Sequence, residues 1–511
     1  MSSLPAFTSR FISTLPGDPS TQNHPRQVRG ALWSPVTPTP VSAPTLLAWS
    51  PEVALQLGLD EAQVRALLPV LSGNTPPPNV TPFAANYGGH QFGHWAGQLG
   101  DGRAIGIGEL NGFELQLKGA GPTPYSRRGD GRAVLRSSIR EFLCSEAMHH
   151  LGVPTTRALA LVQTGDLVVR DMFYDGNAAP EPGAIVCRVA PSFLRFGNFE
   201  LPTSREEHAL LKGLLDFTLA HYFPELGAGA YAEFLNEVAR RTARLMAHWQ
   251  AVGFVHGVMN TDNMSVLGLT IDYGPYGWVD DFDPSWTPNT TDAEQRRYRY
   301  GNQPGIGMWN VERLGIALLP MLGDDESKVE AALLEYQRAF EAEASRRFTA
   351  KLGLAEDAVE TVHALFSWLA QEETDMTIFF RQLAKVVVGP KPTTFPDVLR
   401  AAFYGTPSEA HVQAGLSWLS TWWDLTRARD AAPSVLAERM NAVNPKYVLR
   451  NYLAQQAIDA AHAGDGGAAV NELLDVMRRP FDEQPGRERF AEKRPDWARS
   501  KPGCSALSCS S

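Results

Sequence analysis

The chain has 511 residues, of which 44% are hydrophobic, and it carries a formal net charge of −10. That length exceeds what one hydrophobic core usually serves, so we expect more than one structural unit. The acidic balance argues against a general nucleic-acid-binding protein, and no apolar run approaches the roughly 18–20 residues that span a bilayer. Only four cysteines are present and the first segment lacks a secretory pattern, so we expect a cytoplasmic protein with neither membrane nor nucleic-acid partners.

Composition divides the chain into four parts. Residues 1–80 are rich in Pro around one helical segment, about 51–68, which predicts an extended arm packed on a core. Residues 81–200 are dense in Gly and short apolar runs, which predicts a β-rich unit with one clear helix. Residues 201–478 are predicted to be mainly helical, and 479–511 to form a peripheral tail.

One helix can be predicted in detail from its apolar spacing. The stretch YAEFLNEVARRTARLMAHWQAVG places seven residues on one face and ends at Gly253. Those seven residues are Phe234, Leu235, Val238, Thr242, Leu245, Met246 and Trp249.

The stretch GQLGDGRAIGIGELNGFELQLKGAG predicts two strands joined by a type I′ turn at Asn111-Gly112. Ahead of the first strand, Gly100 and Gly102 would let backbone amides approach phosphate oxygens, and Arg103 would add positive charge. The second strand ends at Lys118. Two alternatives stay open, because the glycines could simply shape the sheet and Lys118 could be a solvated strand residue.

The next segment, SRRGDGR, clusters three arginines around Asp130-Gly131 and suits an anion-lined loop or a solvated turn. On the helix that follows, Glu146 lies within the apolar stripe and Glu141 lies nearly opposite. A carboxylate inside an apolar stripe needs a cation, so periodicity alone favours Glu146 as the partner of a lysine.

Arg188 and Arg195 are seven residues apart in CRVAPSFLRFGNFE. If both turned towards one cleft, their guanidinium groups could grip phosphate oxygens in a forked geometry. They could equally be structural arginines paired with surface acids.

The stretch FVHGVMNTDNMSVLGLTIDYGPYG holds two acids and an amide, Asp262, Asn263 and Asp272, in apolar surroundings. Residues 266–271 are predicted to form two short strands that turn at Gly268. Burying such polar groups without partners costs several kcal/mol, and a metal ion is one candidate partner.

A Gly-rich loop, a strand lysine, a helix glutamate, an Asp/Asn loop and a later acid follow the order of a protein-kinase-like nucleotide site. One position departs from it, because Val258 stands where kinases carry their catalytic Asp. With this departure, the chain resembles the selenoprotein O family of kinase-like protein adenylyltransferases. The resemblance covers essentially residues 30–485 and rests on several long blocks. Among them are NYGGHQFGHWAGQLGDGRA, LKGAGPTPYSRRGDGRAVLRSSIREFL, RVAPSFLRFGNFE, HGVMNTDNMSVLGLTIDYGP, RYGNQPGIGMWN and NPKYVLRNYLAQQAI.

The resemblance implies an α+β, two-lobed kinase-like fold with a β-rich N-lobe, a helical C-lobe, an extended N-terminal arm and a flexible C-terminal tail. It also implies transfer of AMP from ATP, held in reverse relative to a kinase, to Ser, Thr or Tyr hydroxyls of protein substrates, with Mg²⁺ or Mn²⁺ as cofactor. Carried over by position, Asp262 is the base, Asn263 and Asp272 are the metal ligands, and Glu141 is the partner of Lys118, with Glu146 as its rival. The nucleotide would be contacted by Gly100, Gly102, Arg103, Lys118, Asp130, Gly131, Arg188 and Arg195.

The tail ends in CSALSCSS, and Cys509 occupies the position that selenocysteine has in animal members of the family. Cys504 is close enough in sequence to pair with it as a redox couple, while Cys144 and Cys187 are expected in the core. Two other functions stay open at this point: a kinase that transfers the γ-phosphate, and an inactive nucleotide-binding pseudokinase.

Overall fold

The computed structural model describes residues 5–172, 175–428 and 431–508, and it combines an antiparallel sheet with many helices. The main sheet has the strand order β1-β3-β6-β7-β10-β9-β2, and β8 pairs with β10. Every neighbouring pair in it is antiparallel. Its strands are β1 (Trp33–Pro35), β2 (Thr45–Trp49), β3 (Phe83–Ala85), β6 (Ala104–Leu110), β7 (Phe113–Lys118), β8 (Ala133–Val134), β9 (Arg157–Arg170) and β10 (Ala179–Ala190).

Two small antiparallel pairs lie outside this sheet. They are β4 (Gly88–Gln91) with β5 (His94–Gln98), and β11 (Phe254–Val255) with β12 (Gly277–Trp278). Short 3₁₀ turns occur at Pro224–Leu226, Thr261–Asn263, Thr290–Asp292, Tyr300–Asn302, Glu488–Ala491 and Asp496–Arg499.

The predicted hairpin between β6 and β7 is confirmed. Asn111 and Gly112 have φ angles of 48° and 81°, and a type I′ turn requires positive φ at both central residues. The turn and a one-residue register shift between Gly106 and Gly108 together pair Ala104 with Lys118, so the lysine at the end of β7 lies beside the point where the Gly-rich loop enters β6.

The first 80 residues are more integrated than an extended arm, because β1 and β2 belong to the main sheet. The single helix predicted near 51–68 is divided into α2 (Pro51–Gln56), α3 (Glu61–Ala66) and α4 (Leu68–Leu71), while α1 (Arg10–Thr14) comes earlier. The break follows from two local features. Gly58 has φ +75° just after α2, and Asp60 caps α3 with a reciprocal capping box.

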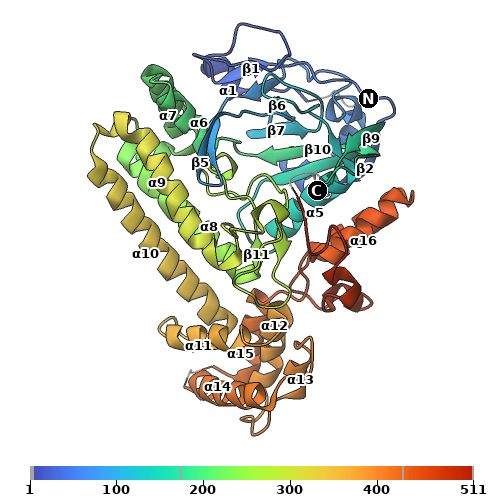
Figure 1. The fold of residues 1–511 in the computed structure, drawn as a ribbon, viewed down its shortest axis with the longest axis vertical. Helices are drawn as coiled ribbons and strands as arrows, with labels where there is room; N and C mark the ends of the chain where they lie inside the picture. Colours follow the sequence, from blue (N-terminus) through green and yellow to red (C-terminus); the bar gives the residue numbers. More distant parts are fainter. Residues whose placement is uncertain (1–4, 173–174, 429–430, 509–511) are drawn as a thin grey trace.

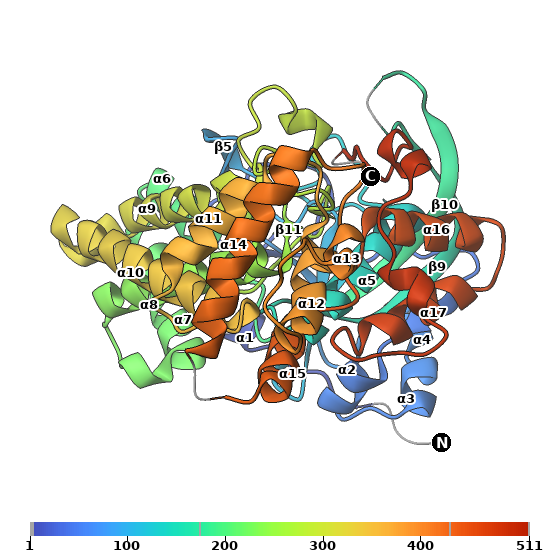
Figure 2. The same ribbon diagram turned by 90° about the horizontal axis from the view of Figure 1, so that it is seen from below.

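Helix α5 (Leu135–His150) packs against β9 and β10, and α16 (Asn451–His462) and α17 (Ala468–Met477) pack against it as well. Figure 2 shows α16 and α17 beside α5, so the last helices of the chain return to the sheet. As a result, nearly every residue of α5 is buried.

After the main sheet, the chain forms α6 (Phe196–Ser204) and α7 (His208–Tyr222). Three long helices then pack on one another along one side of the molecule (Figure 1). They are α8 (Tyr231–Val252), α9 (Gln303–Leu322) and α10 (Glu326–Lys351). The prediction for α8 is confirmed, since all seven residues of its apolar face are buried. The helix ends at Gly253, which adopts the left-handed conformation at φ +75°. The chain then enters the loops that carry Asp262 and Asp272.

The remaining helices form a separate group at the end of the molecule farthest from the sheet (Figure 1). They are α11 (Val359–Leu369), α12 (Met376–Val387), α13 (Asp397–Arg400), α14 (Glu409–Arg427) and α15 (Pro433–Val443). These helices share a second hydrophobic core, which includes Leu365, Phe379, Leu419 and Trp422 and also takes in Ala251 of α8 and Phe348 of α10.

Two local predictions were wrong. Residues 266–271 form no hairpin; instead Ser265 bridges Arg195, and Thr270 bridges Thr155. These partners satisfy the backbone groups that a hairpin would have paired. The tail is not flexible over its described part either, because the Leu507 side chain is fully buried and its carbonyl accepts from the Thr290 N–H at 2.8 Å.

Within the described residues, no helix has both the length and the apolar character that crossing a membrane requires.

Candidate active site

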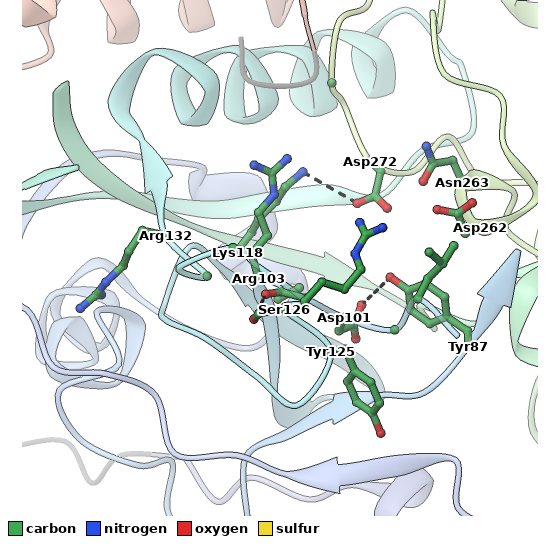
Figure 3. Close-up of a pocket in the computed structure, with 18 of the residues that line it drawn as sticks. Tyr87, Asp101, Arg103, Lys118, Tyr125, Ser126, Arg132, Asp262, Asn263 and Asp272 are labelled. Carbon is green, nitrogen blue, oxygen red and sulfur yellow. Dashed lines mark hydrogen bonds and ion pairs between the residues drawn. The ribbon is translucent and has the colours of Figure 1, made fainter. Parts of the chain in front are cut away.

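A cavity of about 870 Å³ lies between the sheet and the loops that follow α8. It is lined by the Gly-rich loop, the end of β7, the 125–132 loop, and the two segments that carry Asp262 and Asp272. Figure 3 shows Lys118 facing Asp272 across it, with Asp262 and Asn263 beside Asp272. We call this space the nucleotide cavity, after the ligand that the sequence predicts for it. Gly100, Gly102, Arg103, Lys118, Asp130, Gly131, Arg188, Asp262, Asn263 and Asp272 all line it.

The glycines of the cavity wall have a steric role. Gly100 has φ +72°, and a Cβ there would lie 2.4 Å from Cγ of Tyr125. Gly131 has φ +69°, and a Cβ there would lie 2.1 Å from the carbonyl carbon and oxygen of Gly121. Both positions hold two loops in close contact, so only Gly fits them.

The partner of Lys118 in the structure is Glu141, as the family resemblance implied. Lys118 Nζ lies 2.6 Å from Glu141 Oε2 and 3.8 Å from Asp272 Oδ1. Lys118 is only 8% exposed, which excludes the alternative of a solvated strand residue. Burial lowers the pKa of Lys118, and the two carboxylates offset only part of that effect.

The rival assignment, Glu146, is wrong. Its carboxylate accepts from Arg157 Nε at 2.8 Å and Nη2 at 2.7 Å, and from Ser50 Oγ at 2.7 Å. Burial alone would raise the pKa of Glu146, but Arg157 and the hydrogen bonds outweigh it and lower the pKa. Periodicity misled the assignment because α5 is covered on all sides, so an apolar stripe does not show which face meets the cavity.

Asp272, whose side chain is 21% exposed, is the centre of a charge cluster whose arginines are buried. It adopts φ +60°, an uncommon conformation for a non-Gly residue. Its Oδ2 lies 2.6 Å from Arg195 Nη1, and its Oδ1 pairs with Arg188. Burial would raise the pKa of Asp272, but Arg195, Arg188 and Lys118 outweigh burial and hold that pKa well below its usual range.

Arg188 and Arg195 both reach the carboxylate of Asp272, as expected if the two arginines turn towards one cleft. Arg188 lies on β10, where Nη1 is also 3.3 Å from Glu141 Oε1. Arg195 immediately precedes α6, and its Nη1 donates to the backbone oxygen of Asp262 at 2.8 Å. Both guanidinium groups are buried among acids, so they are not structural arginines paired with surface carboxylates.

Asp262 and Asn263 lie in a 3₁₀ turn at Thr261–Asn263. Asp262 Oδ2 accepts from Gln91 Nε2 at 3.2 Å, and its Oδ1 is buried without a hydrogen-bond partner among the described residues. Burial raises the pKa of Asp262 to about 7 despite the nearby Arg195. Asn263 Nδ2 donates to the carbonyl of Val258 at 2.9 Å, which fixes the orientation of the amide.

The donor set suits a hard divalent cation that also binds phosphate. The part of the chain that the structure describes contains no cluster of three or more His, Cys, Asp or Glu side chains able to hold a metal. Mg²⁺, however, is commonly held by one or two protein oxygens together with substrate phosphates and water. Asp272 and the amide oxygen of Asn263 supply oxygens of this kind, which leaves the unpartnered Oδ1 of Asp262 for another role.

The residues of the 127–132 loop lie at the rim. Asp130 is paired with Arg170 at 2.6 Å and is half exposed. Arg132 donates to the carbonyls of Thr39 and Pro40 and points away from the acid cluster (Figure 3). Asp130 therefore stabilises the rim, while Arg127 and Arg128 also line the cavity.

Sequence reasoning missed three residues that support the cluster. Asp101 accepts from Gln116 Nε2 at 2.9 Å and from Tyr87 Oη at 3.2 Å, and it lies 3.9 Å from Arg195. Gln91 comes from the β4–β5 pair and contacts Asp262. An acid enclosed by Gly100 and Gly102 was a signal that could have identified Asp101, whereas nothing in the sequence distinguished Tyr87 or Gln91.

The tail assignment is only partly described. Cys504 is free and 4% exposed, and burial raises its pKa to about 11. Cys509 lies outside the described residues, so the proposed redox pair has one described member. Cys144 and Cys187 are buried, as predicted for core residues.

Comparison with known proteins agrees with this geometry. Residues 21–478 match the family model "Protein adenylyltransferase SelO". The chain is 60% identical to the protein nucleotidyltransferase YdiU of Aromatoleum aromaticum, over 98% of this chain and 99% of that protein. It is 58% identical to the proteins of the same name from Azoarcus sp. and Xanthomonas campestris pv. campestris, in each case over 99% of both chains. The chain therefore belongs to the SelO family of protein adenylyltransferases, and with it to the protein nucleotidyltransferases.

Proposed function

We propose that this protein transfers AMP from ATP to hydroxyl groups of Ser, Thr or Tyr in protein substrates and releases pyrophosphate. The observation that carries the proposal is the arrangement of one cavity. Lys118, Arg188, Asp262 and Asp272 line it. Glu141 and Arg195 do not line it, but they pair with Lys118 and Asp272 directly behind its wall.

The sheet and the helices below it correspond, in this proposal, to the two lobes of a kinase-like fold. The cavity supports that correspondence, because β7 and α5 supply its lysine and glutamate while the loops after α8 supply its acids. Val258 lines the cavity where a kinase would carry its catalytic Asp. This departure supports a nucleotide held in reverse, with the α-phosphate towards the acceptor hydroxyl.

Asn263 and Asp272 are the proposed ligands of a divalent cation. Such an ion, Mg²⁺ or Mn²⁺, would neutralise phosphate charge and favour in-line attack when bound. Arg188 and Arg195 already clamp Asp272 in a fixed position, so the cluster needs little reorganisation during the reaction. Lys118, Arg103, Arg188 and Arg195 are the proposed contacts for the phosphates and the leaving pyrophosphate.

Asp262 is the proposed general base. The acceptor hydroxyl oxygen forms a bond to the α-phosphorus, the bond from that phosphorus to the pyrophosphate oxygen breaks, and the hydroxyl proton passes to Asp262. Its Oδ1 has no other hydrogen-bond partner among the described residues, while Gln91 orients Oδ2. Proton transfer to a positioned base contributes typically ~10²–10⁴-fold.

A paired labelling assay tests the proposal. The purified protein with Mg²⁺ or Mn²⁺ receives ATP labelled on the α- or on the γ-phosphate, and self-modification and acceptor proteins serve as readouts. We expect label from the α-phosphate alone, and none in Asp272→Ala or without divalent cation. Label from the γ-phosphate alone would establish a kinase, and nucleotide binding without any transfer would establish an inactive binding protein.

A further inference from the structure

A second cavity, of about 430 Å³, lies where four helices end. His150 of α5, Val252 of α8, Lys351 of α10 and Val443 of α15 are the last residues of these helices, and all four line it. We call this space the helix-end cavity. It shares no lining residue with the nucleotide cavity. Along α5, nine residues separate Glu141 from His150, a rise of about 13 Å.

The wall of the helix-end cavity is strongly basic. Arg346, Arg347 and Lys351 line it, and its lining includes no Asp or Glu. His149 and His150 also line it, but burial lowers the pKa of both, to about 4 for His149, so they add polar nitrogens rather than charge. Outside the wall, Glu343 lies 2.6 Å from both Arg346 and Arg347. One carboxylate thus serves two guanidinium groups, and the third cation, Lys351, receives none.

Lys351 is the side chain that lacks compensation. Lys351 is only 5% exposed. Among the described residues, no carboxylate lies within ion-pair distance of its Nζ, and no group accepts a hydrogen bond from that Nζ. Its Nζ lies 4.7 Å from the centre of the Phe380 ring. Burial, and secondarily Arg347, lower the pKa of Lys351 to about 7. A lysine is rarely buried without a partner.

The hydrogen-bonding needs of the α10 carbonyls do not account for the position of Lys351. Cations do stabilise helix C-termini, but the last carbonyls of α10 already have donors. Phe348 O and Ala350 O accept from the N–H groups of Leu352 and Gly353, and Lys351 O accepts from Asn444 Nδ2 at 2.8 Å. In the same lining, Nε2 of His150 is buried without a hydrogen-bond partner among the described residues.

We propose that the helix-end cavity binds a small phosphate-bearing anion, held by Lys351, Arg347 and His150. Two or more converging cations favour a dianion. Arg347 Nε already pairs with Glu343 and its Nη2 contacts His248, so Arg347 would offer the phosphate its charge and Nη1 rather than its whole fork. The volume is sufficient for a small phosphorylated molecule as well as for inorganic phosphate. The site is independent of AMP transfer, since none of these side chains lines the nucleotide cavity.

Calorimetric titration of the full-length protein with inorganic phosphate, pyrophosphate and glucose 6-phosphate tests this inference and separates the possible sources of the phosphate group. We expect binding of at least one probe, weakened at least tenfold by Lys351→Met. Arg338→Gln is the matched control, because Arg338 lies on the same helix with its side chain 73% exposed. It should bind the probe as the wild type does.

A thermal-unfolding series provides the second readout. The probe should raise the Tm of the wild type and of Lys118→Met but not of Lys351→Met. If Lys351→Met fails to fold, Arg347→Gln replaces it, with the same expected loss. The inference is overturned if no probe binds the wild type, if Lys351→Met and Arg347→Gln bind normally, or if Lys118→Met alone abolishes binding, which would place the anion in the nucleotide cavity.

Discussion

The nucleotide cavity and the helix-end cavity both gather cations in the interior, but they compensate the charge differently. In the nucleotide cavity, Arg188 and Arg195 share Asp272, and Lys118 has Glu141. In the helix-end cavity, Lys351 has no acidic partner among the described residues. Burial of an unpaired charge is costly, so the first cavity is organised before any ligand arrives, whereas the second would gain its counter-charge from a ligand.

Replacing Asp272 would remove a carboxylate from the nucleotide cavity and leave its cations less compensated, as in the helix-end cavity. We expect Asp272→Ala to reduce AMP transfer by about 10³-fold or more, because it removes a proposed metal ligand and the carboxylate that Arg188 and Arg195 share. Loss of that shared buried partner should also cost about 3–5 kcal/mol of unfolding free energy. Transfer assays and urea unfolding measure the two effects, and full turnover in the presence of metal would refute the assignment.

Substitutions of the two glutamates on α5 should have different effects, because Glu141 pairs with Lys118 whereas Glu146 pairs with Arg157. Glu141→Gln should slow transfer about 10–100-fold, since a charge-assisted hydrogen bond to Lys118 is worth about 1.5–3 kcal/mol. Glu146→Gln should instead lower the unfolding free energy by about 3–5 kcal/mol, because Arg157 loses its buried partner. Its transfer rate should stay near that of the wild type. A reversal of these two patterns would restore Glu146 as the partner of the catalytic lysine.

Removing the uncompensated charge of the second cavity should stabilise the protein. The pKa of Lys351 is lowered in the fold, so between about pH 7 and pH 10 the unfolded chain binds more protons and the wild type gains stability as pH rises. In phosphate-free buffer, Lys351→Met should therefore be more stable than the wild type at pH 7, by at most a few kcal/mol. That difference should shrink towards pH 10. Urea unfolding across this range measures it, and a constant difference would show that Lys351 is not buried as a charge.

The smallest expected effect concerns the orientation of Asp262. Gln91→Leu removes the hydrogen bond to Oδ2 and should lower kcat for transfer about tenfold, while leaving KM for ATP nearly unchanged. His94→Ala is the control, since His94 is exposed in the same β4–β5 pair. Equal effects of both substitutions would mean that the pair acts only as a scaffold.

Local signals predicted local structure well. Asn111-Gly112 defined a type I′ hairpin, and the spacing from Phe234 to Trp249 with Gly253 defined α8 and its end. These features depend on backbone conformations that the residues themselves prefer. The segment 266–271 failed for the complementary reason, because its backbone partners, Arg195 and Thr155, are distant in sequence.

The sequence by itself determined which residue types the site contains, their order along the chain and, through long matching blocks, the family. Apolar spacing could not tell which carboxylate meets which cation; the tertiary structure decided between Glu141, which the family resemblance implied, and Glu146. Glu141 and Glu146 lie on one helix that is buried on every side, so their partners depend on the strands packed around it. The basic helix-end cavity likewise appears only when four helix ends meet, because its cations are contributed by segments about 200 residues apart. Electrostatic interactions depend on distance in space, and that distance is set by packing rather than by position in the sequence.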